Sequence, residues 1–517
     1  MNIFSQEQIR EADRLTILNQ NISGNALMER AGDRVFEWLD HRLQGNPVQI
    51  HIFCGIGNNG GDGLVVARKL LESGYHVKAY VVDFGSKRSP DFLLNLDRIK
   101  SMKHWPEHFN GDSGEVLPVI WPKDVVVDAI FGIGLNRPPS DWVAQIIRHI
   151  NAAGAFVLSI DIPSGIFMEK ATTKGSAVVQ ATHTLTFQIP KLIFFLPETG
   201  SFTTSWEVLD IGLDRDFLQQ TEPEAILVGK SEALSLYRPR TRFSHKGTYG
   251  HALVIGGSYG KAGAARLASE ACLVAGAGLV TAYIPQCAYQ VLQTSLPEIM
   301  VLTDTNETHI SEISFDIKPQ AIGIGIGMGK HPATVDAFRA FLRNTDIPLV
   351  IDADALNILS ENKELLKDIP QNAVLTPHPK ELERLIGPWD NDREKLDKAR
   401  TFSKTHGVVL VIKDAHTMVL HDDKLYVNST GNPGMATGGS GDVLTGIITG
   451  LIGQGYPSLH AAVLGVYLHG KAGDLAAVRT GYEALRAGSI ITALGDAFLD
   501  LFARPEVQQE TAQENSK

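Results

Sequence analysis

Short apolar runs that end in glycine or aspartate recur along the first half of the chain. One stretch reads VQIHIFCGIGNNGGDGLVVARKLLESGYHVKAYVVD. It predicts a strand over Val48–Cys54, a glycine-rich turn, a helix over about Leu64–Glu72 and a second strand over His76–Val82. The runs VVVDAIFG, AFVLSIDIPSG and HTLTFQI predict three further strands. Strands that alternate with helices indicate βαβ units and an α/β fold.

Aspartates close two of these apolar runs. Asp128 ends the first and Asp161 ends the second. Because ligands of open α/β sheets bind at the carboxyl ends of the strands, we expect both carboxylates to face one crevice. Upstream of the sheet, Ser5 followed by Gln8 resembles a capping box, which predicts a first helix from about Gln6.

A polar segment separates this series from a second one. Around Leu213–Thr241 charged residues, prolines and other polar residues dominate, so we place the domain junction near residues 218–230. Six apolar runs follow: GHALVIGGS, GLVTAYIP, QAIGIGIG, PLVIDADALN, AVLTPHPKE and VVLVIKDA. Helices are predicted over Ala262–Ala275 and Val443–Ile452, with more helix to about Phe502. We therefore predict two α/β domains and a disordered polar tail, over residues 1–222, 223–505 and 506–517.

Length and composition agree with two domains. Single hydrophobic cores rarely grow beyond about 250–300 residues, and this chain has 517. Its net charge of −11 argues against a general nucleic-acid or membrane-surface partner. Three cysteines without CxxC spacing favour a reducing compartment and argue against a disulfide framework or a zinc site. With no signal-type N-terminus and no run of about 18 apolar residues, we expect a cytoplasmic protein without a membrane span.

The first glycine-rich turn permits more than one interpretation. Gly55–Gly60 matches G-x-G-x-x-G between a strand and a helix, and Asp83 lies about 20 residues beyond it. This pattern fits a dinucleotide-binding dehydrogenase, and a tight turn without a ligand fits it equally well. The turn continues through Asp62, so two amides and a carboxylate follow the first glycines. Such side chains are typical of groups that hold a ligand or a hard cation through oxygen.

Three motifs follow one another in this half: GNNGGDG, VVDAIFGIGLNRPP and LSIDIPSGI. Together they resemble the YjeF N-terminal family of NAD(P)H-hydrate epimerases, over about residues 1–217. The resemblance implies a Rossmann-like three-layer fold, epimerisation of the R and S forms of hydrated NADH or NADPH, and a potassium ion held by Asn59, Asp128 and Ser164. The implied substrate contacts are Asn58, Asn59, Gly60, Gly61, Asp62, Gly132, Ile133, Gly134, Leu135, Asn136, Arg137, Pro138 and Asp161.

Two of these contacts have alternative interpretations. Asp161 is the best candidate for acid/base chemistry, because it ends a buried strand that faces the crevice. Alternatively, its carboxylate caps the Pro163–Gly165 turn. Arg137 could pair with a substrate phosphate, or it could be an ordinary surface arginine.

A second glycine-rich stretch, TGNPGMATGGSGDVLTG, precedes an apolar helix in the other half. The backbone amides of Gly439, Ser440 and Gly441 can point at an anion, helped by the helix N-terminus. The lysine and hydroxyl of a P-loop are missing, and Asp442 stands there instead. A carboxylate beside a phosphate is repulsive, so we interpret Asp442 as a base that takes the proton of a hydroxyl attacking a phosphoryl group. The alternative is a simple helix N-cap by Asp442.

Five upstream motifs accompany this stretch: GGSYGKAGAARLA, GIGIGMGK, DADALN, LTPHPKELERL and VIKDAHT. The set resembles the YjeF C-terminal family of ribokinase-like proteins, the ADP- or ATP-dependent NAD(P)H-hydrate dehydratases, from about Lys230 to Phe502. The resemblance implies that the nucleotide phosphorylates the hydroxyl of the hydrate with Asp442 as base, that phosphate then leaves, and that Mg²⁺ bridges the phosphates. The implied substrate contacts are Ala264, Gly327, His378 and Asp442. The implied nucleotide contacts are Lys413, Asp414, Ala415, His416, Thr417 and Gly441.

Two positions depart from the pattern of this family. GPGLG is usual where Gly325–Gly329 reads GIGMG, and the missing proline should free the backbone of this loop. A small residue is usual where Asp414 stands, and a carboxylate there could alter nucleotide affinity or donor preference. His378, flanked by two prolines, could alternatively be a turn residue.

Both resemblances together imply a metabolite-repair enzyme with two activities. The epimerase supplies the S epimer, and the dehydratase consumes it with ADP, giving AMP and phosphate. The expected ligands are NAD(P)HX, ADP, Mg²⁺ and K⁺, and we expect a homo-oligomer. One alternative is a ribokinase-like kinase of small molecules, recognisable by a stable phosphorylated product. The other is a non-catalytic YjeF N-terminal binding domain like those of RNA-decay scaffolds, against which Asn59, Asp128, Asp161 and Ser164 argue.

Overall fold

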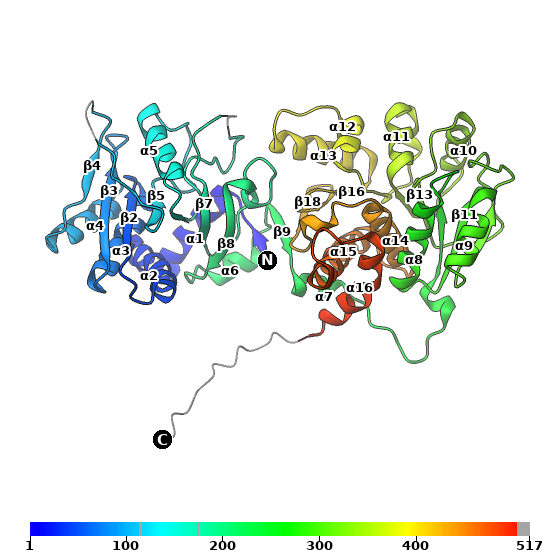
Figure 1. The fold of residues 1–517 in the computed structure, drawn as a ribbon, viewed down its shortest axis with the longest axis horizontal. Coiled ribbons are helices and arrows are strands. Elements are labelled where there is room, and N and C mark those ends of the chain that lie inside the picture. Colours follow the sequence, from blue (N-terminus) through cyan, green and yellow to red (C-terminus); the bar gives the residue numbers. More distant parts are fainter. Residues whose placement is uncertain (113–115, 173–174, 504–517) are drawn as a thin grey trace, which may run out of the picture. The chain divides into compact units, whose positions relative to one another are not determined.

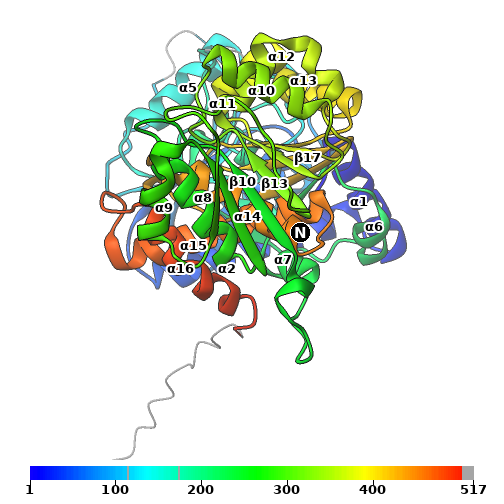
Figure 2. The same cartoon turned by 90° about the vertical axis from the view of Figure 1, so that its right-hand side faces the viewer.

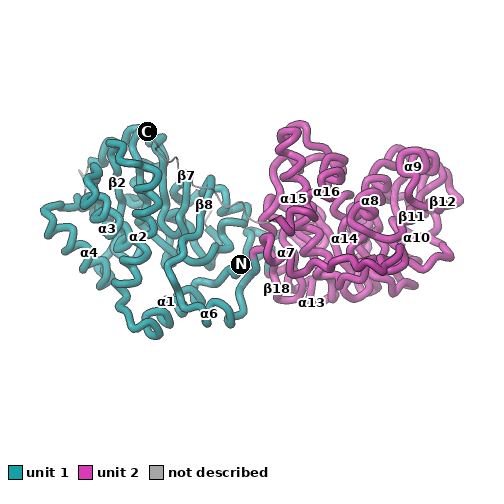
Figure 3. Tube along the Cα trace, turned by 90° about the horizontal axis from the view of Figure 1, so that it is seen from below, with its two compact units in different colours: residues 1–226, 389–396 teal, residues 227–388, 397–517 magenta. Residues whose placement is uncertain are grey.

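The computed structural model describes residues 1–112, 116–172 and 175–503, and the predicted tail over residues 506–517 lies outside these ranges. The chain forms two compact units (Figures 1 and 3). Unit 1 consists of Met1–Ile226 with Trp389–Leu396, and unit 2 consists of Leu227–Pro388 with Asp397–Lys517. The first division falls within the polar segment, a few residues beyond the predicted boundary. The return of residues 389–396 to unit 1 has no counterpart in the sequence prediction.

Unit 1 is built on a parallel sheet with the strand order β4-β3-β2-β5-β6-β7-β8. Its strands are β2 (Gln49–Cys54), β3 (His76–Val82), β4 (Glu107–Phe109), β5 (Val125–Ala129), β6 (Phe156–Ile160), β7 (Ala181–Phe187) and β8 (Thr203–Leu209), and a short β1 (Asn2–Ile3) pairs with Ala225 and Ile226. The five predicted strands are confirmed, whereas β4 and β8 have no predicted counterpart. The register places Asp128 of β5 between Phe53 of β2 and Ser159 of β6.

Helices cover both faces of this sheet. They are α1 (Gln6–Asn19), α2 (Gly24–Leu43), α3 (Asn58–Glu72), α4 (Pro90–Ser101), α5 (Asp141–Ala152) and α6 (Arg215–Gln220). The helices α2, α3 and α4 bury Val35, Leu64 and Phe92 against one face, and α5 buries Val143 and Ile147 against the other. This three-layer arrangement confirms the predicted fold class, and the capping box at the start of α1 is also confirmed.

The prediction for the start of α3 was wrong. The helix begins at Asn58, more than a full turn before Leu64, so the NNGGDG residues are helical. Close packing requires the glycines there: a Cβ on Gly60 would lie 1.7 Å from a backbone oxygen, and one on Gly63 would lie 2.6 Å from the Ala129 Cβ. Intrinsic propensity disfavours glycine in helices, so a local pattern places these residues in a turn.

Unit 2 is built on a larger sheet with the strand order β9-β18-β17-β16-β15-β14-β13-β10-β11-β12. Neighbours from β16 to β12 pair in parallel, and β17 pairs antiparallel with β16 and β18. The strands are β9 (Ala225–Val228), β10 (His251–Ile255), β11 (Leu279–Ile284), β12 (Met300–Thr303), β13 (Ala321–Ile324), β14 (Leu349–Ile351), β15 (Val374–Leu375), β16 (Val409–Ile412), β17 (Met418–His421) and β18 (Lys424–Asn428). The six predicted strands are confirmed, and β9, β12 and the β17–β18 hairpin are additional.

Helices flank this second sheet too. They are α7 (Lys230–Leu236), α8 (Ala262–Val274), α9 (Tyr289–Ser295), α10 (Pro332–Leu342), α11 (Ala353–Glu361), α12 (Pro379–Ile386), α13 (Asp392–His406), α14 (Ser440–Gly453), α15 (Ser458–Thr480) and α16 (Ala487–Asp500). Figures 1 and 2 show α10 to α13 along one face and α8, α14, α15 and α16 along the other. Val443 and Ile447 of α14 share a core with Val350 and Val374 of the sheet. None of the helices in the described ranges is both long enough and apolar enough to cross a membrane.

Candidate functional site

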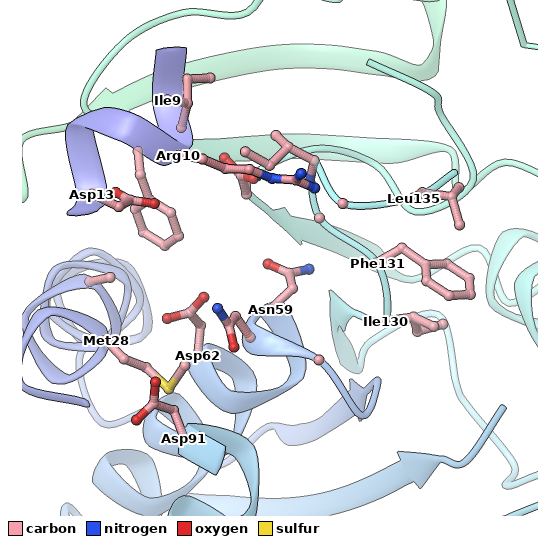
Figure 4. A pocket seen from close by; sticks show the side chains of 18 of the residues that line it. Ile9, Arg10, Asp13, Met28, Asn59, Asp62, Asp91, Ile130, Phe131 and Leu135 are labelled. Atoms are coloured by element: carbon pink, nitrogen blue, oxygen red, sulfur yellow. Dashed lines mark hydrogen bonds between the residues drawn. The ribbon is translucent and has the colours of Figure 1, made fainter. Parts of the chain in front are cut away.

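A cavity of about 1020 Å³ lies in unit 1, where β2, β5 and β6 end (Figure 4). The predicted substrate contacts that line it are Asn58, Asn59, Asp62, Gly132, Ile133, Gly134, Leu135, Asn136, Arg137, Pro138 and Asp161. Gly60 and Gly61 do not line it, because they are buried in the first turns of α3, where a Cβ on Gly61 would lie 2.6 Å from the Met28 sulfur. Arg137 is exposed and lines the cavity, which leaves both of its interpretations open.

Asp161 faces this cavity from a strained position. Its backbone has a φ of 68°, a left-handed conformation that residues other than glycine rarely adopt. Its carboxylate accepts a hydrogen bond from the Ile133 amide at 3.4 Å and pairs with the Lys191 ammonium at 2.9 Å. It makes no hydrogen bond to the Pro163–Gly165 turn, where the Ser164 amide donates to Asp128 instead. The capping interpretation of Asp161 was therefore wrong.

Lys191 is the buried counter-ion of this carboxylate. Only 1% of its side chain is exposed. Its ammonium also donates to the Thr186 hydroxyl at 2.7 Å and to the Phe187 carbonyl at 3.0 Å. A buried charge is tolerated only when it is paired and hydrogen-bonded, and Lys191 meets both conditions through Asp161, Thr186 and Phe187. Sequence reasoning missed Lys191, because it follows a predicted strand without a recognised motif.

Two further carboxyls share the cavity with Asp161. Burial and then the Asp161 charge raise the pKa of Asp13 to about 6, against the opposing effect of Lys191. Burial also raises the pKa of Asp62 well above its ordinary value, and the charges of Asp161, Asp13 and Asp91 act in the same direction. Sequence reasoning missed Asp13, which lies on α1, a helix recognised only by its capping box.

Two of the proposed potassium ligands, Asp128 and Ser164, are in direct contact. Asp128 is fully buried and accepts hydrogen bonds from the Ser159 hydroxyl at 2.8 Å, the Ser164 amide at 2.9 Å and the Ser164 hydroxyl at 2.6 Å. Asn59 lies beside Gly132, the residue after Phe131: a Cβ on Gly132 would be 3.3 Å from both the Asn59 Cγ and an Asp161 oxygen. The side-chain nitrogen of Asn59 is buried without a hydrogen-bond partner among the described residues.

The chemistry of these groups suits a hard cation. The Ser164 hydroxyl lies 3.2 Å from the Phe131 carbonyl oxygen, so a carboxylate, a hydroxyl and a carbonyl converge from two loops. Burial raises the pKa of Asp128, although its hydrogen bonds from Ser164 and Ser159 oppose the effect. Oxygen donors of this kind match alkali and alkaline-earth cations rather than softer metals. Within the described ranges, no three His, Cys, Asp or Glu side chains gather in a way that could hold a metal ion.

The second glycine-rich stretch forms the start of α14 in unit 2. Gly439 is the N-cap, with a φ of 90°, and Asp442 lies in the first turn of the helix. The interpretation of Asp442 as the N-cap was therefore wrong. Burial raises the pKa of Asp442 to about 6, the charges of Asp352 and Asp354 act in the same direction, and Lys413 opposes them.

Asp352 connects this helix to the predicted nucleotide segment. It is buried, and it accepts hydrogen bonds from the Lys413 ammonium at 2.8 Å and from the Thr445 hydroxyl at 2.6 Å. A Cβ on Gly441 would lie 3.4 Å from the Lys413 nitrogen and 3.8 Å from an Asp352 oxygen. The structure thus gathers Gly441, Lys413 and Asp442 in one place. Asp352 was quoted within DADALN but not singled out, although it directly follows a predicted strand.

The remaining nucleotide residues lie in the loop between β16 and β17. Asp414 is exposed, and its carboxylate accepts a hydrogen bond from the Ala415 amide at 2.8 Å. His416 places its Nδ1 3.2 Å from the Asn428 carbonyl oxygen, and burial lowers the pKa of its ring. Thr417 accepts a backbone hydrogen bond from Asn428.

The loop over Gly325–Gly329 is more constrained than its missing proline predicts. A Cβ on Gly327 would lie 3.0 Å from the Ala264 Cβ, so these two predicted substrate contacts are neighbours. The Ser258 hydroxyl donates to the Gly327 carbonyl at 2.8 Å, and the Gly329 amide donates to Asp354 at 2.8 Å. Side chains from outside the loop therefore hold its backbone.

His378 serves the turn before α12. Its Nδ1 accepts hydrogen bonds from the amides of Lys380 and Glu381, and its own amide donates to the Glu381 carboxylate at 2.9 Å. This capping box confirms the turn interpretation. Burial, followed by the charge of Lys413, lowers the pKa of the ring, which favours its neutral form. The other ring nitrogen, Nε2, lies 3.5 Å from the Glu381 carboxylate, and 46% of the side chain is exposed.

Comparison with known proteins covers both units. Residues 24–193 match the family model of the YjeF-related protein N-terminus, and residues 252–494 match the family model of NAD(P)H-hydrate dehydratase. The bifunctional NAD(P)H-hydrate repair enzyme Nnr of Moorella thermoacetica is 38% identical over 507 residues, covering 95% of this chain and 95% of that relative. The chain belongs to the family of bifunctional NAD(P)H-hydrate repair enzymes.

Other relatives of this repair-enzyme family agree. The bifunctional NAD(P)H-hydrate repair enzyme Nnr of Escherichia coli is 33% identical over 521 residues, covering 99% of this chain and 96% of the relative. Among solved structures, the ADP/ATP-dependent NAD(P)H-hydrate dehydratase of Bacillus subtilis, co-crystallised with ATP and Mg²⁺, matches with 26% identity and a TM-score of 0.47, over 54% of this chain and 99% of that chain. The family models and the two bifunctional relatives confirm the resemblance inferred from the motifs for both halves.

Proposed function

We propose that unit 1 epimerises the R and S forms of hydrated NADH and NADPH, and that unit 2 dehydrates the S form with ADP, giving AMP and phosphate. The observation that carries this proposal is a repair-enzyme relationship that extends over both units. The fusion is chemically reasonable, because the dehydratase accepts one epimer and the epimerase converts the other into it.

The proposed chemistry of unit 1 rests on its cavity. Asn58 and Asn59 begin α3, where unsatisfied backbone amides and the helix dipole favour an anionic group of the substrate. Asp161 and Lys191 form an ion pair beside them. Asp161 is the proposed acid/base residue, because its carboxylate lines the cavity beside the predicted substrate contacts.

Potassium is the proposed cation of unit 1, held by Asp128 and Ser164 with Asn59 nearby. When bound there, the ion supplies positive charge beside an anionic ligand. We expect that replacing K⁺ by a large organic cation lowers the rate of epimerisation and leaves dehydration of the S form unchanged. Rates of both steps in matched buffers measure this, with dehydration as the internal control. An epimerisation rate that is independent of the monovalent cation contradicts the potassium site. Asp128→Ala is a weaker test, because it also removes the acceptor of Ser159 and Ser164.

The proposed chemistry of unit 2 centres on Asp442. It takes the proton of the substrate hydroxyl, which attacks the terminal phosphoryl group of the nucleotide. The amides at the start of α14 and the Lys413 ammonium stabilise the phosphates. Phosphate is a better leaving group than hydroxide, so its departure restores the nicotinamide ring. Mg²⁺ would neutralise phosphate charge, and it needs only one or two carboxylates besides the phosphate oxygens and water.

The test of the proposed function separates the epimers. Purified protein is given R-NADHX or S-NADHX with ADP or ATP, and the absorbance of restored NADH is followed. We expect both epimers to be converted, and the S form to be converted even without K⁺. A stable phosphorylated product favours the small-molecule kinase instead. Conversion of the S form alone favours a non-catalytic unit 1. A cytoplasmic location and self-association remain predictions, the latter measurable by light scattering.

A further inference from the structure

Asp13 is a carboxyl group in the unit 1 cavity to which the motifs assign no role. Figure 4 shows it on α1, turned toward the same space as Asp62 of α3. No described residue donates a hydrogen bond to its carboxyl group. Asp13 is half-buried, and a carboxyl group that loses part of its hydration without gaining hydrogen bonds does not stabilise the fold, so its position indicates a function in the cavity.

We propose that Asp13 is the general acid of epimerisation and that Asp161, paired with Lys191, is the base. The inference rests on the proposed function of unit 1. It assigns to the first helix a catalytic residue that lies well before the glycine-rich stretch.

The reaction needs one acid and one base. The hydrate carries its hydroxyl on the ring carbon next to the ring nitrogen, and the two epimers differ at that carbon. Asp13 gives its proton to this hydroxyl, the C–O bond breaks with its electron pair, and water leaves as the nitrogen lone pair forms a C=N⁺ bond. A water molecule then adds to the other face of the ring and gives a proton to Asp161. The product is the opposite epimer. Asp13 is now ionised and Asp161 is protonated, which are the states that the reverse reaction requires.

The surroundings of the two carboxyl groups fit the assignment of Asp13 as acid and Asp161 as base. Asp161 pairs with the buried Lys191 ammonium at 2.9 Å. Asp13 has no such partner, and burial raises its pKa to about 6, with the Asp161 charge acting in the same direction. Besides Asp161, the other charged groups that line the cavity are Arg10, Asp62, Lys87, Asp91, Arg137 and Lys191. A general acid works best with a pKa near the working pH.

Asp62 is the rival for this role. Its side chain is more deeply buried, and its pKa is raised well above the ordinary value. Such a group holds its proton too tightly to be an efficient acid near neutral pH. Asp62 therefore suits a protonated hydrogen-bond donor to the substrate.

The experiment compares Asp13→Asn, Asp13→Glu and Glu11→Gln in the full chain. Glu11 lies on the same helix outside the cavity and pairs with Arg14 on the surface, so its variant matches the chemical change without touching the site. R-NADHX is supplied with ADP and K⁺, and S-NADHX is the internal control for the dehydratase. We expect Asp13→Asn to lower kcat of epimerisation by about 10²–10⁴-fold and Asp13→Glu to restore part of it. Glu11→Gln and all rates with S-NADHX should match the wild type.

The pH dependence gives a second readout. An acid is active when protonated, so wild-type epimerisation should fall as the pH rises through the pKa of Asp13, and Asp13→Asn should lack this fall. An Asp13→Asn enzyme within a few-fold of wild type in kcat overturns the proposal, as does a change confined to KM. If the wild-type protein fails to convert R-NADHX, the epimerase function itself is refuted. This outcome differs from a failure of the Asp13 proposal, in which the wild type is active and Asp13→Asn is equally active. If Asp13→Asn does not fold, the Asp13→Glu variant provides the test. A pH profile of epimerisation identical to that of the wild type contradicts the role of Asp13 as general acid.

Discussion

Asp442 combines two opposing influences at the start of α14. The helix dipole favours a negative charge in the first turn. Burial and the neighbouring Asp352 and Asp354 carboxylates disfavour it and raise the pKa of Asp442 to about 6. A base poised close to neutrality is well matched to removing a proton from a hydroxyl.

We expect Asp442→Asn to lower dehydration of S-NADHX by about 10²–10⁴-fold while epimerisation is unchanged. Wild-type dehydration should rise with pH to a plateau above about 6, because the base acts when ionised, and the variant should lack this rise. Nucleotide affinity should be equal or higher, since one negative charge beside the phosphates is removed. Dehydration within a few-fold of wild type would reduce Asp442 to a structural residue.

Stability provides the control for this variant. A raised pKa means that the folded protein holds the proton more tightly than the unfolded chain does. The contribution of Asp442 to stability is therefore lost as the pH rises through about 6. Asparagine carries no such dependence, so melting curves above pH 6 should show the variant to be at least as stable as the wild type. A lower melting temperature there would contradict the assignment of the raised pKa.

The sequence located carboxylates that follow apolar strands, such as Asp128 and Asp161, because the end of a parallel strand is also the edge where ligands bind. It did not locate Asp13 or Lys191. These residues reach the cavity from helix α1 and from the segment after β7, and their proximity depends on tertiary packing that no local spacing records.

At the scale of elements, glycines decide where backbone segments approach each other. Gly325 has a φ of 116°, and a Cβ there would lie 2.0 Å from the Asp352 backbone oxygen and 2.6 Å from the Ala355 Cβ. Gly329 also has a positive φ, 75°, but its nearest neighbour, the Ser258 hydroxyl, would lie 3.9 Å away. A side chain at Gly329 would therefore meet backbone strain alone, whereas one at Gly325 would meet both backbone strain and steric overlap.

We expect Gly329→Ala to destabilise unit 2 by about 1–2 kcal/mol, the strain of a left-handed residue. Gly325→Ala should destabilise it by clearly more and should also reduce dehydration, because the displaced Asp352 pairs with Lys413. Denaturant unfolding and S-NADHX turnover measure both effects. Equal losses of stability in the two variants would show that the close approach at Gly325 relaxes freely.

Strands of the two sheets were largely predictable, since buried parallel strands appear as short apolar runs. The elements that were missed depend on context. The β17–β18 hairpin contains polar residues and pairs antiparallel with β16. Strand β12 has only four residues, MVLT, too few to show a pattern of apolar and polar positions. The early start of α3 was missed because its glycines are required by packing, whereas local propensity disfavours them.

At the scale of the whole molecule, the segment over residues 389–396 belongs to unit 1 although it lies far along the chain. Asp392 and Lys395 form an ion pair at 2.6 Å with 6% and 5% of their side chains exposed. Asp392 also accepts a hydrogen bond from the Glu198 amide at 2.9 Å. Arg393 donates to the Met168 carbonyl and pairs with Glu224.

We expect Asp392→Ala to destabilise unit 1 by about 3–5 kcal/mol, because it removes a buried carboxylate that pairs with Lys395 and accepts a hydrogen bond from the Glu198 amide. The matched control is Asp397→Ala on the same helix, whose partner is Arg400 and whose side chain is 73% exposed, so its loss should cost less than about 1 kcal/mol. Heat inactivation of epimerisation and of dehydration, measured separately, follows the two units. An Asp392→Ala protein whose dehydration alone becomes heat-sensitive would contradict the assignment of this segment to unit 1.

The same segment constrains how such a gene can divide. A single break at the polar junction would give one product with unit 2 and another that lacks eight of the residues of unit 1, Trp389–Leu396. A separated epimerase would then need replacements for the contacts of Asp392 and Arg393, and a separated dehydratase would retain a surface segment without its original role. Fission into two independent genes therefore requires compensating substitutions, whereas duplication followed by loss of one activity preserves every contact. Lineages that descend from this arrangement are expected to separate the two activities by that second route.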